Sequence, residues 1–499
     1  MERNLYACIF FADVRRSMAF ASFFLLAGVA FAQIGSTAAH STEKTVPALL
    51  VSDVHFDPFW DPGKVPSLAA APVSQWKAIL SAPPSPDRER RFAALQQSCG
   101  ARGADTSFPL LESSLKAMRA HAAGAKFVAV SGDLIAHDFS CKYEALLAHP
   151  KPGDYKSFVE KTLDYVIEEL RGSFPGVPVY AALGNNDSDC GDYRLDARSE
   201  FLSVSGKEVT GDSSASERSD ALESFSAGGY YSVPLPAPIA HARLLVLNDL
   251  FMSKKYRSCA GKADPGAAEA QLAWLLQQLS QARHDKEKIW VMAHIPPGVD
   301  LHSTVTKLDD VCDGQGPEMF LSSEKLADEL AEFDDVVQLA IFAHTHMDEV
   351  RLLKPDNSNA SPASRKGVAV KMVSSISPID GNNPSFTVVQ IDSASAALAD
   401  YRVYEASNRT GVDAAWTEEY DFARTYGKAA FTPTSVSELI AGFAADAAAK
   451  TEASRSYISD FSLGYLSPVL KAFWPQYVCS LSNRTPNAYR SCVCSTAGK

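Results

Sequence analysis

The sequence lacks the short motifs that mark several common classes of hydrolase and nucleotide-binding enzyme. Neither a GxSxG nucleophile elbow nor a GxxxxGK[ST] phosphate-binding loop occurs in its 499 residues. These absences exclude a serine mechanism of the α/β-hydrolase type and a P-loop nucleotide site. Internal repeats are absent too, so a repeat architecture is not expected.

An excess of positive charge is also missing. The chain has 47 Lys and Arg against 59 Asp and Glu, which gives a formal net charge of -12. A protein that binds nucleic acid by neutralising phosphates needs the opposite balance, so no nucleic-acid-binding surface is expected. A small anionic substrate is compatible with this charge, because bound divalent cations invert the local potential.

Long apolar runs are absent after the N-terminal segment. There, Arg15-Arg16 precede an apolar stretch from Met18 to Phe31, and Ala30-Phe31-Ala32 fits a cleavage site. A membrane anchor is the alternative, but the stretch is shorter than the roughly 20 residues that span a bilayer. We therefore expect a signal peptide over 1–32, a flexible lead-in over 33–44, and a secreted or periplasmic protein without a transmembrane segment.

Cysteine is scarce but becomes informative in an exported chain. Of nine cysteines, Cys8 would leave with the signal peptide and eight would remain, an even number that favours disulfides. A zinc cluster is the competing interpretation, but the CxC pair at Cys492 and Cys494 has no second close pair, which is poor zinc spacing.

Six short apolar runs each end in residues of the kind that bind metal ions. Such runs are typical of buried strands, and ligands of layered α/β proteins gather at the carboxyl ends of strands. The runs and the residues that follow them are 48–51 with Asp53 and His55, 127–130 with Asp133, 177–183 with Asn185, 244–247 with Asn248 and Asp249, 289–292 with His294, and 338–342 with His344 and His346.

Each of these residues alone is weak support for a metal site. Asp53 and His55 are two residues apart, which on a strand directs both side chains to one face, and His344 and His346 repeat this spacing. The joint occurrence at strand ends, in this order, predicts one metal site with oxygen and nitrogen ligands.

The α/β body is expected over 45–404. The helices expected between its strands are 110–122, 155–170 and 267–282. A stretch rich in Ser, Asp, Gly and Glu, 203–226, is interpreted as a surface insertion, and 356–366 as a polar hairpin connection. Alanine-rich helical spacing at 435–452 and a cysteine-containing end predict a C-terminal helical subdomain over 405–499.

The ordered motifs resemble those of the calcineurin-like metallophosphoesterases. The motifs are Asp53-x-His55, Gly132-Asp133, Gly184-Asn185-Asn186-Asp187, His294-Ile295-Pro296-Pro297-Gly298, Ala343-His344-Thr345-His346 and Gly381-Asn382-Asn383-Pro384. Within that family the chain is similar to the acid sphingomyelinase-like branch, which includes nucleotide phosphodiesterases and endopolyphosphatases. The resemblance implies an α/β fold: a β-sandwich flanked by helices in α/β/β/α layers.

The resemblance also implies two divalent metal ions. Zinc is the first choice, with Mn²⁺, Fe and Mg²⁺ as alternatives. Asp53, His55 and His346 would hold one ion, and Asn185, His294 and His344 the other. Asp133 would bridge them. A metal-bound hydroxide would then attack phosphorus in line, so no covalent protein nucleophile is required.

Two positions depart from the family pattern. The family usually has histidine after the ligand asparagine, and here Asn186 stands there. Asn186 can donate a hydrogen bond to a phosphate oxygen but cannot supply a proton. His137 is therefore the candidate proton donor, with a purely structural histidine as the alternative. The second departure is Ala343, where glycine is usual; one methyl group is tolerated unless that backbone needs a positive φ.

The resemblance also guides the cysteine pairing. Position relative to the branch favours Cys259–Cys312 and Cys479–Cys492. Cys141 and Cys190 both closely follow loops of the candidate site, which favours a third pair. Cys99 and Cys494 are the two that remain.

These observations predict an exported dinuclear-metal phosphoesterase that hydrolyses phosphodiester or phosphoanhydride bonds. Its substrate would be a small phosphodiester, a nucleotide or polyphosphate. These rank above sphingomyelin, because no lipid-binding domain is expected between the signal peptide and the first motif. The alternatives are a sphingomyelin phosphodiesterase proper and an inactive secreted binding protein. Asn186 suggests the latter, but the presence of all seven ligands opposes it.

Overall fold

The structure is a computed structural model that describes residues 45–147, 153–306, 311–355, 366–407, 415–462 and 467–496. The described residues belong to one compact unit, Glu43–Lys499. The predicted signal peptide and lead-in, 1–44, lie outside them. Within the described ranges, no helix combines the length and apolar character needed to cross a bilayer.

The first of two six-stranded sheets contains the strand that begins the body. Its order is β12-β11-β10-β1-β2-β3, and β1, β2 and β3 run parallel while β10 pairs antiparallel with β1. The strands are β1 (Thr45–Val51), β2 (Val128–Val130), β3 (Val179–Ala181), β10 (Ser385–Asp392), β11 (Leu398–Glu405) and β12 (Thr417–Asp421). Three of the predicted strands therefore lie side by side, with their carboxyl ends at one edge.

The second sheet contains the other three predicted strands. Its order is β4-β5-β6-β7-β9-β8, with β5, β6, β7 and β9 parallel. The strands are β4 (Tyr231–Pro234), β5 (Ala242–Val246), β6 (Lys288–Met292), β7 (Val337–Phe342), β8 (Glu349–Leu353) and β9 (Val368–Met372). The antiparallel β8–β9 pair confirms the expected hairpin, although most of its connection, 356–365, lies outside the described residues.

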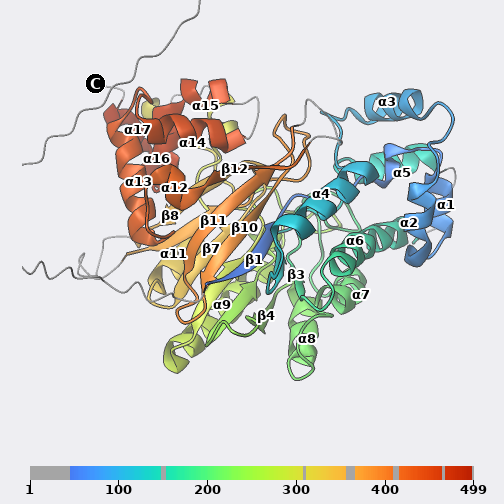
Figure 1. The fold of residues 1–499 in the computed structure, drawn as a ribbon, viewed down its shortest axis with the longest axis horizontal. Coiled ribbons are helices and arrows are strands. Elements are labelled where there is room, and N and C mark those ends of the chain that lie inside the picture. Colours follow the sequence, from blue (N-terminus) through green and yellow to red (C-terminus); the bar gives the residue numbers. More distant parts are fainter. Residues whose placement is uncertain are drawn as a thin grey trace, which may run out of the picture. The chain divides into compact units, whose positions relative to one another are not determined.

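Alternation along the strands shows how the sheets are layered. In β5, Leu244 and Val246 belong to the large core shared with the first sheet, whereas Leu245 packs in a second core with helices α9 (Gly266–Asp285) and α11 (Lys325–Glu332). On the other side, α4 (Phe108–His121) and α6 (Asp154–Ser173) pack against the first sheet (Figure 1). The predicted α/β/β/α layering is confirmed.

The stretch interpreted as a surface insertion is instead largely helical. It forms most of α7 (Glu200–Val209) and α8 (Arg218–Gly228), and these helices bury Leu202 and Phe225 completely. The prediction of an insertion rested on the many Ser and Asp residues, most of which occupy the exposed faces and the turn between the two helices, although Ser205 and Ser213 are buried.

The C-terminal part contains a group of helices, drawn in red in Figure 1. They are α12 (Phe422–Tyr426), α13 (Pro433–Ala445), α14 (Glu452–Ser462), α15 (Ser467–Ala472), α16 (Trp474–Ser480) and α17 (Pro486–Thr496). The predicted boundary at 404 precedes β12, which pairs with β11 and so extends the first sheet. The division into 45–404 and 405–499 therefore stays a prediction.

All eight cysteines in the described region form disulfides, which removes the zinc-cluster interpretation. The pairs are Cys99–Cys141, Cys190–Cys259, Cys312–Cys494 and Cys479–Cys492. Only Cys479–Cys492 was predicted correctly, and Cys259–Cys312, Cys141–Cys190 and Cys99–Cys494 are wrong. Proximity to an active-site loop in sequence did not identify the partner, because helix packing sets it. For example, α3 (Arg88–Cys99) packs on α5 (Phe139–Leu146), which places Cys99 beside Cys141.

Candidate metal centre

The first two ligand candidates follow β1 after the strand has ended. Both have left-handed backbones, with φ of 45° at Asp53 and 42° at His55, so the expectation that they share a strand face is wrong. Hydrogen bonds hold this conformation: Asp53 N donates to Gly132 O and His55 N to Asp133 O, at 3.0 and 2.9 Å. Left-handed turns therefore direct both side chains to one point.

Left-handed backbone recurs at three more of the seven candidates. Asp133, His344 and His346 have φ of 55°, 72° and 63°. Each such residue costs roughly 1–3 kcal/mol, and strain of this kind persists only where the surrounding structure enforces it, as at functional sites. Ala343 does not have a positive φ. Alanine can therefore stand where glycine is usual without straining the backbone.

Asp53, His55 and His346 meet on one side of the centre. The two imidazole Nε2 atoms are 3.2 Å apart. Asp53 Oδ1 is 3.7 Å from His55 Nε2 and 3.4 Å from His346 Nε2. All three side chains are almost completely buried.

Asn185, His294 and His344 meet on the other side. His294 Nε2 lies 3.2 Å from Asn185 Oδ1 and 3.3 Å from His344 Nδ1. Asp133 lies between the two sets: its Oδ2 is 3.5 Å from His55 Nε2 and 3.2 Å from His294 Nε2. The structure therefore brings all seven predicted side chains together.

Backbone carbonyls orient the two central histidines. His55 Nδ1 lies 2.9 Å from Ile135 O, and His294 Nδ1 lies 2.8 Å from Ser131 O. Each carbonyl accepts from Nδ1–H, so each Nε2 is presented to the centre. This is the usual arrangement of metal-binding histidines.

Two buried aspartates hold the loops that carry these groups. Asp187 accepts from the backbone N–H groups of Leu134, Ile135 and Gly184. Asp249 accepts from those of His294 and Ile295. Both aspartates were noted at strand ends in the sequence, and both act on the loop backbone rather than at the centre.

The carboxylates of the cluster favour positive charge on two of its four histidines. Burial lowers the pKa of His55, but Asp133 and the other nearby carboxylates outweigh it and raise the pKa to about 9. The pKa of His294 is raised to about 10 against burial by the same carboxylates. Burial instead lowers the pKa of His344 to about 3 and that of His346 to about 4. The carboxylates thus stabilise cations at this point even at the cost of desolvation.

The donor set fits divalent metal ions. Asp53 Oδ1 is buried and has no hydrogen-bond partner among the described residues, which is costly unless a cation satisfies it. Two compact groups within the centre, Asp53–His55–Asp133 and Asp133–His294–His344, each have ligand atoms that all lie within 4.8 Å of one another. Imidazole nitrogen and carboxylate oxygen together suit zinc and neighbouring transition metals.

His137 stands at the edge of the centre. Its ring stacks on His55 with centroids 4.0 Å apart, and its side chain is 20% exposed. Asp105 holds it through both Nδ1, at 3.0 Å, and its backbone N–H, at 2.9 Å. Buried Lys142 lies 3.6 Å from Asp105 and 3.0 Å from Asp57. His137, His55 and His346 also lie close enough together to share an ion, so a ligand role competes with that of proton donor.

Asn186 contacts the carboxylate between the two sets. Its backbone N–H donates to Asp133 Oδ1 at 2.8 Å, and its side-chain Nδ2 donates to Asp133 Oδ2 at 2.9 Å. In this arrangement the amide orients Asp133, whereas the sequence suggested a contact with substrate phosphate.

Sequence reasoning missed several residues around the centre. Asp105 and Tyr193 lie outside the strand-end motifs, and neither has a distinctive local pattern. Tyr193 OH lies 3.0 Å from His344 Nε2. Asp380 and Arg102 form an ion pair of 3.1 Å beside His346 and His137. Only the three-dimensional structure identifies these contacts.

The loop of His344 and His346 is held from the C-terminal helices. Thr345 Oγ1 donates to Glu349 Oε1 at 2.8 Å, and Tyr477 OH on α16 donates to Glu349 Oε2 at 3.2 Å. Asp348 and Glu349 are only 3% and 2% exposed. Asp348 pairs with buried Lys371.

Comparison with known proteins agrees with this geometry. The chain is 24% identical over 351 residues to "Sphingomyelinase phosphodiesterase C" of Dictyostelium discoideum, covering 68% of this chain and 72% of that protein. It is 28% identical to "Acid sphingomyelinase-like phosphodiesterase 3b" of Mus musculus, covering 75% of each. It is 24% identical to "Cyclic GMP-AMP phosphodiesterase SMPDL3A" of Mus musculus, covering 69% of this chain and 74% of that protein.

The family comparison covers most of the sandwich and every ligand candidate. Calcineurin-like phosphoesterase matches residues 46–348, a range that runs from β1 to the end of the His344–His346 loop. The sequence-based resemblance and the expectation of a metal-dependent phosphoric ester hydrolase are confirmed. The chain belongs to the calcineurin-like phosphoesterase family.

Proposed function

We propose that this protein is an exported phosphodiesterase that uses two divalent metal ions to hydrolyse phosphodiester or phosphoanhydride bonds of small substrates. The observation that carries the proposal is the position of Asp133 Oδ2, which lies 3.5 Å from His55 Nε2 and 3.2 Å from His294 Nε2. One carboxylate oxygen thus lies beside a histidine from each of the two groups of three ligand candidates, as a bridging ligand requires.

The ligand assignment follows the two sets. Asp53, His55 and His346 would hold one ion, Asn185, His294 and His344 the other, and Asp133 both. Zinc is the first choice because four of the seven ligands are imidazoles, and Mn²⁺, Fe and Mg²⁺ are the alternatives. When bound, such ions lower the pKa of water and offset charge on the phosphate group.

The chain's own groups then act on the substrate from the edge of the site. His137 is placed at the edge of the centre to donate a proton to the departing oxygen: Asp105 accepts from Nδ1–H, and Nε2 lies 3.5 Å from Arg102 Nη2. Asn186 keeps Asp133 in position. No serine, cysteine or lysine lies among the ligands, in agreement with direct attack by water.

Export is the second element of the proposal. The signal peptide over 1–32 accounts for it, and four disulfides agree with folding in an oxidising compartment. A secreted or periplasmic location follows.

Metal analysis combined with an assay on bis-p-nitrophenyl phosphate tests this function. We expect close to two transition-metal ions per chain and turnover that a chelator abolishes and added zinc restores. Bound metal without turnover would instead support the inactive binding protein. Sphingomyelin, nucleotides and polyphosphate, assayed from acid to neutral pH, would then rank the substrates.

A further inference from the structure

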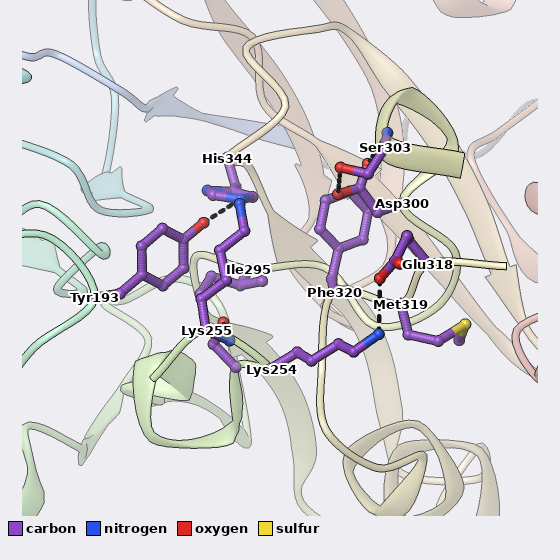
Figure 2. A pocket seen from close by; sticks show the side chains of 11 residues that line it. Tyr193, Lys254, Lys255, Ile295, Asp300, Ser303, Glu318, Met319, Phe320 and His344 are labelled. Atoms are coloured by element: carbon purple, nitrogen blue, oxygen red, sulfur yellow. Dashed lines mark hydrogen bonds and ion pairs between the residues drawn. The ribbon is translucent and has the colours of Figure 1, made fainter. Parts of the chain in front are cut away.

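A cavity of about 250 Å³ opens beside the candidate metal centre. Figure 2 shows the side chains that line it, among them Tyr193, Lys254, Lys255, Glu318, Phe320 and His344. His344 is a ligand candidate, so the cavity adjoins the centre. A substituent on the reacting phosphorus that extends past His344 would enter the cavity.

Two aromatic side chains place His344 at the inner end of this cavity. Tyr193 OH lies 3.0 Å from His344 Nε2. The ring of Phe320 meets that of His344 edge to face, with centroids 5.7 Å apart. Tyr193 and Phe320 lie on opposite sides of the cavity in Figure 2.

The charged groups of the cavity differ in whether they have partners. Lys254 forms an ion pair with Glu318 at 2.7 Å, and Asp300 accepts hydrogen bonds from Ser303 N and Oγ at 2.9 and 2.6 Å. Lys255 lies over the ring of Tyr193, with Nζ 4.9 Å from its centroid. Within the described ranges, no carboxylate lies within ion-pair distance of Lys255, and its electrostatic partner is Asp192, whose pKa burial raises and Lys255 acts to lower.

The position of Lys255 decides which substituent fits. An aromatic wall next to a phosphodiesterase centre suits a quaternary ammonium group such as choline, which binds over a ring face. Here a lysine ammonium already covers the face of Tyr193, so a second cation would be repelled. An anion would instead be attracted by Lys255 and by the metal ions together, against the one carboxylate, Asp300, that the lining holds without an ion pair among the described residues.

We infer that this cavity is a subsite for a second phosphate group and that Lys255 is its specificity-determining residue. The inference rests on the proposed function. It narrows the substrate class to phosphoanhydrides, in which another phosphate adjoins the reacting one, and disfavours choline phosphodiesters. Lysine is a regular phosphate-binding group in proteins.

Three probe substrates test the subsite: tripolyphosphate, bis-p-nitrophenyl phosphate and p-nitrophenyl phosphorylcholine. Lys255→Met should lower kcat/KM for tripolyphosphate by about 10- to 100-fold more than for bis-p-nitrophenyl phosphate, as expected for a charge-assisted hydrogen bond. Lys255→Arg should recover most of the loss. In Lys255→Met, kcat/KM for p-nitrophenyl phosphorylcholine should rise relative to kcat/KM for tripolyphosphate, because a charge that repels the choline group is removed.

Lys116→Met is the matched control, since Lys116 is an exposed lysine on α4 outside the cavity. It should leave the ratio between substrates unchanged. Equal losses on all substrates in Lys255→Met would overturn the subsite, as would a wild-type enzyme that cleaves bis-p-nitrophenyl phosphate but not tripolyphosphate. Failure of the wild type on bis-p-nitrophenyl phosphate, with metal bound, would instead refute the proposed function itself.

Discussion

Replacement of His137 by alanine should separate proton donation from every other role at this centre. The ring packs on His55 at 4.0 Å but is not one of the seven ligand candidates, so its removal should leave metal content unchanged. Asp105 accepts from Nδ1–H, so Nε2, which lies 3.5 Å from Arg102 Nη2, is the nitrogen left to serve a departing oxygen. His137 is therefore needed only where the leaving group requires a proton.

The size of the effect follows from that role. General acid catalysis is typically worth about 10²–10⁴-fold, or about 3–5 kcal/mol of activation free energy. Phosphodiesters with alkyl alcohol leaving groups should lose this factor in His137→Ala. A p-nitrophenolate ion leaves without protonation, so p-nitrophenyl esters should lose less than about tenfold. Asp105→Asn should show the same pattern more weakly, because a neutral amide stabilises a protonated imidazole less than a carboxylate does.

The assay compares kcat on two phosphodiester substrates that differ only in the leaving group, which is an alkyl alcohol in one and p-nitrophenol in the other. Metal content is measured for each variant. His121→Ala is the control, because His121 is an exposed histidine at the end of α4 that stacks on Tyr404. Equal losses on both esters with full metal content would refute proton donation and indicate phosphate positioning. Loss of metal in His137→Ala would show that His137 is a ligand.

The other predictions concern the metal bridge, a disulfide and a buried acid. Asp133→Ala should remove bound metal. It should also lower turnover by more than the roughly 10–100-fold loss that is typical when a residue that only orients a metal ligand is replaced. Retention of more than a tenth of wild-type activity would rule out a bridging role for Asp133. Exposed Asp138→Ala is its control. Replacing both Cys99 and Cys141 by serine, which opens a loop with a sequence separation of 42, should cost about 4 kcal/mol in urea unfolding; non-reducing peptide mapping checks the pair. Burial and nearby glutamates raise the pKa of the Asp164 carboxyl to about 7. The folded protein therefore binds more protons at this group than the unfolded chain does, and the free energy of unfolding falls as pH rises from the usual pKa of an aspartate to 7. At pH 8, the free energy of unfolding of Asp164→Asn should exceed that of wild type by about 1–2 kcal/mol, a range that allows for solvent screening, and at pH 4 the two should be equal. The same difference between variant and wild type at both pH values would contradict the raised pKa.

The sequence contained enough information to predict the strands and the ligand candidates. Apolar runs predict strands whatever surrounds them, and parallel strands bring their carboxyl ends to one edge, so Asp133, Asn185 and His294 could be grouped from their positions in the chain. The local backbone at Asp53 and His55 was not predictable in this way, because their spacing implied a continuing strand, whereas β1 ends with the apolar run at Val51 and left-handed turns follow.

What the sequence could not provide are contacts made by packing. Asp105 reaches His137 across 32 positions, and Tyr193 reaches His344 across 151, with no periodic signal to connect either pair. The disulfide partners of Cys99 and Cys259 depend on helix and loop packing in the same way. Composition was misleading at 203–226, where polar residues on exposed helical faces resembled a loop.

The link from Thr345 through Glu349 to Tyr477 bears on the order in which the enzyme matures. A chain leaving the ribosome presents Asp53 early, but the loop that completes the centre waits for a helix made near the end of synthesis. Until α16 docks, His344 and His346 lack their anchor, and metal offered to the nascent chain meets an unfinished set of ligands. Tyr477→Phe, which removes the hydrogen bond to Glu349, should therefore yield a chain that retains every ligand candidate and loads metal less completely than wild type. Catalytic competence is then a late event, acquired only once the whole polypeptide is available to fold.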